Sequence, residues 1–145
     1  MAFYSIYDIA GSAMRAQSVR LNTIASNLAN ADSAASSEAE AFRAIKPVFA
    51  TIYQALDTTG GVSAKRLGSA SVAISGIVRS DRAVERRLEP GSPLADADGY
   101  VYYSNVNVVE EMADMMSASR AFQTSVDVIS RVNSMQQGLL RLGQV

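Results

Sequence analysis

The sequence predicts a mainly α-helical protein with a small β region, in which long helices at both chain ends enclose a β-ribbon and an extended connector. Three observations in the 145 residues favour this fold. Each end carries an apolar stripe with helical spacing, and the middle carries two runs that alternate between two faces. A charged segment after them contains two prolines, which exclude a regular helix there. We therefore expect residues 1–33 and 104–145 to form a helical core domain, and residues 34–103 to form a central part.

The N-terminal helix is predicted over residues 5–30, after a tail of four residues. Its stripe repeats at intervals of three and four residues, which places one set of side chains on a single helix face: Tyr7, Ala10, Met14, Gln17, Leu21, Ile24 and Leu28. This narrow seam is of the coiled-coil type and needs a partner helix, in this chain or another. The helix should end near Asn30, because Asn30, Asp32 and Ser33 favour turns.

Two runs in the middle of the chain predict a β-hairpin. Residues 46–54 alternate between two faces, and Gly60-Gly61 signals a turn. The second run places four residues on one face: Val72, Ile74, Gly76 and Val78. The spacing between the runs predicts a long loop, with a third short strand near Val62. Because a two-stranded ribbon is marginally stable alone, we expect it to pack on the helices or on a neighbouring subunit.

The last part of the chain predicts an extended connector and then a second long helix. Residues 80–99 form the connector, and the helix runs from about Val108 to Leu142. Asn107 is its predicted N-cap, with Glu110 in the capping-box position. The stripe of this helix again alternates steps of four and three, and then drifts: Val108, Met112, Met115, Ser119, Phe122, Val126 and Ile129, followed by Val132, Met135, Leu139 and Leu142.

Matching seams at the two ends predict that the terminal helices pair as an antiparallel coiled coil. Both termini would then lie at one end, and the ribbon would project from the other. Whether the seam around Met112 and Met115 is closed within one chain or between chains is left open by the pattern. The candidate packing residues, for helices and for subunits, are Tyr7, Met14, Leu21, Ile24, Leu28, Val108, Met112, Met115, Phe122, Val126, Ile129 and Leu139.

The composition excludes several classes of function. The chain has no cysteine and no histidine, so it lacks Ser-His and Cys-His nucleophiles and most transition-metal ligands, and we expect no catalytic, cofactor or metal site. Residues 96–99, Asp-Ala-Asp-Gly, resemble the start of a calcium loop but lack its later ligands, so an ordinary turn is the better interpretation. A net charge of −1 argues against a nucleic-acid binder. No apolar run reaches the roughly 18 residues of a membrane span, and the N-terminus lacks the basic region of a cleaved secretory signal.

Several segments are similar to the flagellar axial proteins, the family that forms rods and hooks. They are GSAMRAQSVRLNTIASNLANADS at 11–33, KPVF at 46–49, TGGV at 59–62, EPGSPLADADGYVYYSNVNVVEEM at 89–112, SASRAFQT at 117–124 and LGQ at 142–144. The resemblance implies a structural protein, not an enzyme. In this family the paired terminal helices line the core of a hollow helical rod, and the middle segment forms an outer layer.

The resemblance also implies partners and a location. The partners would be copies of the chain itself, other flagellar rod proteins, the adaptor that joins the rod to a membrane ring, and the flagellar type III export apparatus. The location would be the periplasmic rod of the flagellar basal body, reached without cleavage of a signal peptide. A helical-hairpin component of a related type III secretion assembly is the alternative interpretation.

Overall fold

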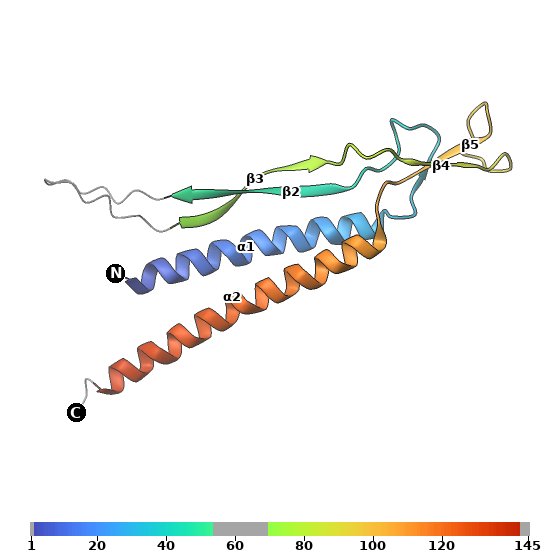
Figure 1. The fold of residues 1–145 in the computed structure, drawn as a ribbon. Helices are drawn as coiled ribbons and strands as arrows, with labels where there is room; N and C mark the ends of the chain where they lie inside the picture. The colour runs from blue at the N-terminus through green and yellow to red at the C-terminus, as the bar shows by residue number, and fades with distance from the viewer. Residues whose placement is uncertain (1, 54–69, 143–145) are drawn as a thin grey trace, which may run out of the picture.

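The computed structural model describes residues 2–53 and 70–142, and it has two long helices and two small antiparallel sheets (Figure 1). The elements follow in the order α1 (Ala2–Ala29), β1 (Ala34–Ala35), β2 (Ile45–Tyr53), β3 (Ala70–Arg79), β4 (Glu85–Leu88), β5 (Tyr100–Tyr103) and α2 (Val108–Leu142). This architecture is mainly α with a small β region, as predicted. The expected third strand near Val62 lies outside the described residues.

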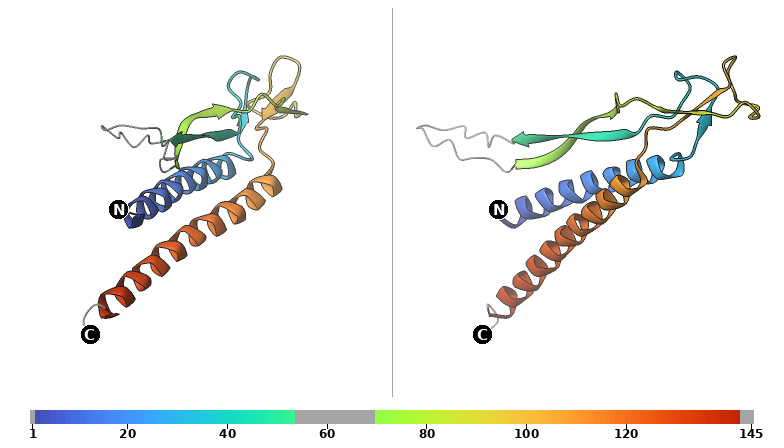
Figure 2. Two further views of the ribbon diagram at one scale, coloured as in Figure 1. Left: turned by 60° about the vertical axis from the view of Figure 1, so that its left-hand side comes forward. Right: turned by 45° about the vertical axis from the view of Figure 1, so that its right-hand side comes forward.

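The two helices run in opposite directions (Figures 1 and 2). They lie close together where α1 ends and α2 begins, and they diverge toward the chain termini. An ion pair joins Arg20 of α1 to Asp114 of α2 at 2.8 Å, and the Tyr7 hydroxyl contacts the Asn133 side chain far along α2. These contacts fix the antiparallel order, and both termini lie at the same end, as predicted. The end of α1 at Ala29 agrees with the sequence prediction, but the helix begins at Ala2, so the predicted tail is wrong.

The β2–β3 ribbon does not project from the far end of the helices. It folds back along α1 toward the end that holds the termini (Figures 1 and 2), and both strands contact that helix. The Ser12 hydroxyl of α1 accepts the backbone N–H of Val72 at 3.2 Å. The prediction that the ribbon projects from the end opposite the termini is therefore wrong. The reason is the low stability of an isolated two-stranded ribbon. A two-stranded ribbon is marginal alone, and α1 offers it a surface to cover.

A β-bulge in β3 changes which side chains share a face of the ribbon. Val48 lies opposite Gly76, but the next residue, Phe49, lies opposite Ile74, so Ser75 is an extra residue in its strand. Directly opposed residues share a face, so the bulge places Ile74 on the face opposite to Gly76. The single face predicted for Val72, Ile74, Gly76 and Val78 is therefore wrong beyond Ser75.

The predicted extended connector contains a strand of a second sheet. This sheet has the order β1-β5-β4, and Val101 at its centre is fully buried. The sequence of strand β4, ERRL, is typical of a solvated charged segment. Two of its side chains nevertheless contact tyrosine rings of the neighbouring strand β5. The guanidinium groups of Arg86 and Arg87 lie over the rings of Tyr100 and Tyr103, at 5.3 and 4.5 Å from the ring centres. Contacts of this kind leave no signal in the spacing of hydrophobic residues along the sequence.

Candidate assembly interface

The side of α2 that faces α1 is marked by its least exposed residues. They follow alternating steps of four and three: Glu111, Met115, Ala118, Phe122, Ser125, Ile129, Val132 and Gln136. Ala118 is completely buried and Val132 is 6% exposed. On α1, the most buried apolar positions are Ala10, Ala16 and Ile24. Ala10 of α1 and Ser125 of α2 line the same groove, whereas Ala16 lines a cavity beside β3. Small residues at the contact between the helices allow their axes to approach closely.

The predicted packing residues of α2 divide into two groups. Met115, Phe122 and Ile129 lie half-buried on the inward side described above. The others are exposed to solvent: Val108 is 37% exposed, Met112 54%, Val126 43% and Leu139 57%. The seam within the chain is therefore rotated by one residue from the predicted stripe, through Ala118 and Ser125 in place of Ser119 and Val126. A role of the exposed group in contacts between subunits stays a prediction.

The predicted packing residues of α1 all lie on its less exposed side. Ile24 is 3% exposed, and Tyr7, Met14, Leu21 and Leu28 are half-buried. The Tyr7 hydroxyl also lies 3.3 Å from the Gln136 side-chain oxygen, so this residue holds the diverging ends of the helices together. Between these ends lies an apolar groove of about 330 Å³, lined by Ile6, Ile9, Ala10, Ala13, Thr124, Ser125 and Val128.

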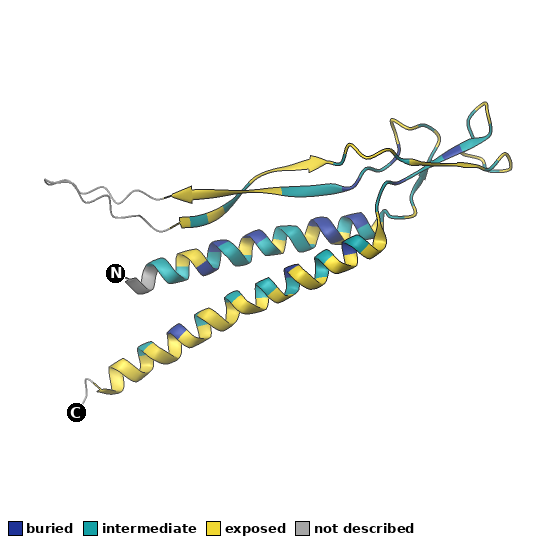
Figure 3. Cartoon of the chain, in the orientation of Figure 1, coloured by how far each residue is buried: buried dark blue, intermediate teal, exposed yellow. Residues whose placement is uncertain are grey.

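Most residues of α2 and of the outer part of the ribbon are exposed (Figure 3), and many of them are large and apolar. Near the start of α2, Val109 is 76% exposed and Met116 is 59% exposed. Near its end, Met135 is 59% exposed and Leu142 is 76% exposed. Soluble monomers rarely leave extended apolar surface uncovered. The free chain therefore has the surface of a protein that packs against other chains.

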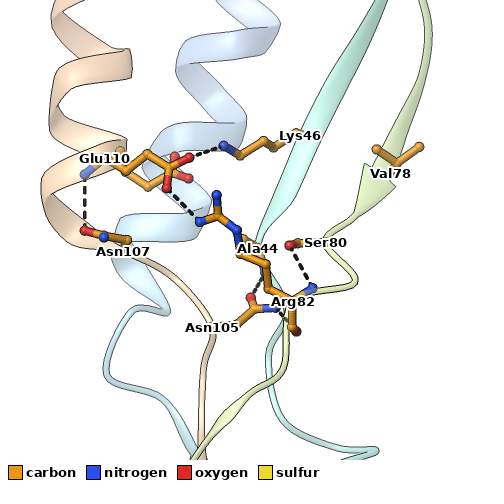
Figure 4. Close-up of a pocket in the computed structure, with 9 residues that line it drawn as sticks. Ala44, Lys46, Val78, Ser80, Arg82, Asn105, Asn107 and Glu110 are labelled. Atoms are coloured by element: carbon orange, nitrogen blue, oxygen red, sulfur yellow. Dashed lines mark hydrogen bonds and ion pairs between the residues drawn. The ribbon is translucent and has the colours of Figure 1, made fainter.

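A polar junction fixes the start of α2 to the ribbon (Figure 4). The Glu110 carboxylate accepts hydrogen bonds from Lys46 Nζ at 2.8 Å and from Arg82 Nη1 at 2.7 Å. These two bonds, first from Lys46 and then from Arg82, lower the pKa of Glu110 to about 2. Asn107 caps the helix as predicted, since its Oδ1 accepts the N–H groups of Val109 and Glu110. The Glu110 side chain does not complete a capping box, because it bonds to these two cations instead.

Two asparagine side chains hold the chain where β2 begins. The buried Asn27 amide accepts the N–H of Ile45 and donates to its carbonyl oxygen, both at 2.9 Å. Asn105 accepts the N–H of Ala44 and donates to the carbonyl oxygen of Arg82, both at 2.7 Å. The sequence interpretation gave neither residue a role. The available signal for Asn27 was its position three residues after Ile24, on the buried side of the helix.

The ion triad at Glu110 should make stability fall in acid. A carboxyl group whose folded pKa is depressed stabilises the fold above its ordinary pKa of 4.5, and this contribution is lost as the pH falls toward about 2. We expect Glu110→Gln to lower the melting temperature at pH 7 but to leave it close to the wild-type value at pH 2. Asp127→Asn, which removes an exposed carboxylate that forms no ion pair with another described residue, is the control. Equal differences from wild type at both pH values would show that the triad is not the cause.

Residues 96–99 form a turn in which the Asp96 carboxylate is held by hydrogen bonds within the chain. Asp96 accepts the N–H groups of Asp98 and Tyr100 and the hydroxyl of Tyr102. These bonds, with Tyr100 first, lower the pKa of Asp96. Over the described ranges, no three acidic side chains gather as a metal site would require. In the same ranges, no helix has the length and apolar content of a membrane span.

Comparison with known proteins shows to which class of protein the chain belongs. Residues 8–34 match the family model described as flagella basal body rod protein, and residues 97–142 match the C-terminal model of the flagellar basal body rod FlgEFG proteins. These segments cover most of both terminal helices, including all of α2, along which large apolar residues are exposed. The fold and these matches define a structural protein of the bacterial flagellar basal-body rod and not an enzyme.

Full-length relatives identify the family within that class. The chain is 44% identical to the flagellar basal-body rod protein FlgC of Salmonella typhimurium, over 99% of this chain and 100% of the relative. It is 45% identical to FlgC of Escherichia coli O6:H1 and 42% identical to FlgC of Yersinia enterocolitica, with the same coverage. The chain belongs to the FlgC family, whose members are subunits of the proximal rod.

Proposed function

We propose that the chain polymerises through its terminal helices into the hollow shaft of the proximal rod and transmits torque by rigid packing. The observation that carries this proposal is the apolar surface left exposed along α2, at both its start and its end. The two exposed groups lie far apart on the helix, so one surface of a subunit can meet a different surface of the next. Such heterologous contacts, when they do not close into a ring, generate a helical assembly.

The helical segments 1–33 and 104–145 would form the inner core, with a coiled-coil-like seam, and residues 34–103 would form an outer layer. The exposed residues Val108, Met112, Val126 and Leu139 would pack between subunits in this arrangement. The seam of α1 and α2 would set the shape of each subunit. This division assigns each predicted packing residue either to the seam within the chain or to a contact between subunits.

The proposed partners are further copies of the chain, other rod proteins, the adaptor between rod and membrane ring, and the type III export apparatus. The proposed location is the periplasmic part of the basal body, reached without cleavage of a signal peptide. The names of the relatives support a place in the rod over the alternative of a helical-hairpin component in a related secretion assembly.

Electron microscopy of isolated basal bodies tests this function. A short epitope inserted between residues 60 and 61, which belong to none of the described helices and strands, would carry the label. We expect the label on the proximal rod in every basal body. We also expect mass spectrometry of the isolated rods to find the chain with its first residues intact. Basal bodies with complete rods that carry no label, in cells whose motility depends on the labelled chain, would contradict the proposal.

A further inference from the structure

Four exposed charged side chains, two on each helix, have no partner within the described part of the chain. Asp8 and Arg15 lie on α1, and Asp127 and Arg131 lie on α2. No ion pair or side-chain hydrogen bond joins any of them to another described residue. Water solvates exposed charges, so these groups cost the free chain little and remain available to another molecule.

The two charges of α1 flank a helix face that another helix can approach closely. Gly11, Ser18 and Ala25 follow at intervals of seven residues, so they share this face. Ser18 and Ala25 are exposed, and a Cβ atom added at Gly11 would meet, among the described atoms, only the Arg15 guanidinium at 3.7 Å. Asp8 comes three residues before Gly11 and Arg15 four after it, which places both charges on the same side of this row.

A face of α2 matches this row in spacing and in charge. Met116, Gln123 and Ser130 are exposed and also follow at intervals of seven residues. Asp127 comes four residues after Gln123 and three before Ser130, so it flanks its row on the same side as the charges of α1 flank theirs, and Arg131 lies on that side too. When two antiparallel helices meet along these rows, the equal spacing pairs the residues as Gly11 with Ser130, Ser18 with Gln123 and Ala25 with Met116.

The charges favour this antiparallel pairing. It places Asp127 within about 1.5 Å of Arg15 along the helix axis and Arg131 within about 3 Å of Asp8, which long arginine side chains easily span. The two helices then present opposite charges on the same side of the contact. In a parallel pairing the charged sides of the two rows would lie on opposite sides of the contact, and the charges would stay unpaired.

We propose that this face of α1 binds the matching face of α2 from a second copy of the chain, with ion pairs from Arg15 to Asp127 and from Asp8 to Arg131. The proposal rests on the rod assembly proposed above. Two different surfaces meet, so the contact is heterologous and can repeat from copy to copy. Copies in a helical assembly all point the same way along its axis, so α1 of one copy and α2 of the next run in opposite directions, as this contact requires.

Gly11→Leu should separate folding from assembly. In the free subunit the new side chain enters open space beside Arg15 and replaces a residue that destabilises helices, so the melting temperature should rise by about 2–4 °C. In the rod the same side chain keeps the two helices apart. Incorporation into basal bodies, measured against wild-type chain in the same cells, should therefore fall about tenfold. Gly91→Leu, where an added Cβ also has no described atom within 4 Å, is the control and should incorporate normally. Normal incorporation of Gly11→Leu would overturn the proposal.

An exchange of charges tests the ion pair between Arg15 and Asp127. Arg15→Asp and Asp127→Arg should each reduce incorporation about tenfold, because each places like charges together. Both should leave the melting temperature of the free subunit unchanged, since neither residue is paired there. The double variant should restore incorporation to within about twofold of wild type. Asp98→Arg, an exposed reversal in the turn at residues 96–99, is the control. Single variants that incorporate normally, or a double variant no better than the singles, would exclude this contact.

Disulfide formation between copies tests the register, because the chain has no cysteine of its own. A copy with Ser18→Cys and a second copy with Gln123→Cys, expressed together, should form linked pairs of the chain in oxidised basal bodies. Ser18→Cys with Ser130→Cys should not, because Ser130 would lie about 10 Å further along the contact, opposite Gly11. A link through Ser130→Cys, or no link between copies, would overturn the proposal. Absence of the wild-type chain from basal bodies would instead contradict the proposed function itself.

Discussion

Phe122→Ala is expected to prevent incorporation of the chain into the rod. Phe122 lies half-buried on the side of α2 that faces α1, between the buried Ala118 and the half-buried Ser125. Truncation of a buried phenylalanine costs about 3–5 kcal/mol through lost burial and a residual cavity, and partial exposure places this site near the lower value. In a polymer the loss recurs in every subunit, so incorporation should fail even where the monomer still folds.

Gln123→Ala is the control for this experiment. Gln123 is the next residue on the same helix and is exposed, and changes at such positions usually stay within about 0.5 kcal/mol. The measurements are the melting temperature of each purified subunit and the number of copies in isolated basal bodies at equal expression. If both variants incorporate like the wild type, Phe122 does not stabilise the contact between the helices, and the side of α2 assigned to the seam is wrong.

The helices could be predicted from the sequence because their signals are local. An apolar period of three and four residues, turn-forming residues after Ala29 and an asparagine cap at Asn107 are sufficient to place both elements. The structure gives α2 the predicted bounds and the predicted cap. The two runs of the hairpin were found for the same reason, since alternation of faces is a property of each strand alone.

The rotation of the α2 seam could not be predicted, because periodicity favours large apolar side chains. The stripe through Met112 and Val126 is more hydrophobic than the one through Ala118 and Ser125, yet the latter faces α1. Close approach of two helices favours small side chains at the contact, and the partner determines this, not the helix itself. The larger side chains remain outside, which is consistent with surfaces that contact other subunits.

The second sheet and the polar junction were missed because they depend on contacts between distant segments. Strand β4 pairs with β5 across an intervening turn, and its charges meet tyrosine rings that only the fold brings near. Glu110 was interpreted through its own helix, as a capping residue. Its partners, Lys46 and Arg82, come from the ribbon and from the segment after it. A sequence pattern cannot show which of several possible partners a charged side chain selects.

Asn27→Asp is expected to lower the melting temperature of the subunit by about 10 °C at neutral pH, which corresponds to about 3 kcal/mol in a chain of this size. The new side chain has nearly the same shape and can still accept the N–H of Ile45. It cannot donate to the carbonyl oxygen of Ile45, which lies 2.9 Å from the donor nitrogen of Asn27. The substitution therefore places two acceptors against each other at a position that is only 1% exposed.

The pH dependence of this variant distinguishes the lost donor from a general packing defect. Burial beside a carbonyl oxygen raises the pKa of the new carboxyl group, so its penalty is full above that pKa and diminishes as the group takes up a proton and can donate again. The difference in melting temperature between Asn27→Asp and wild type should therefore shrink as the pH falls from 7 to 4. Asn22→Asp, exposed on the same helix, provides the control and should melt like the wild type at both pH values. A difference that stays constant with pH would mean that the Asn27 amide does not hold Ile45 through the bond it donates.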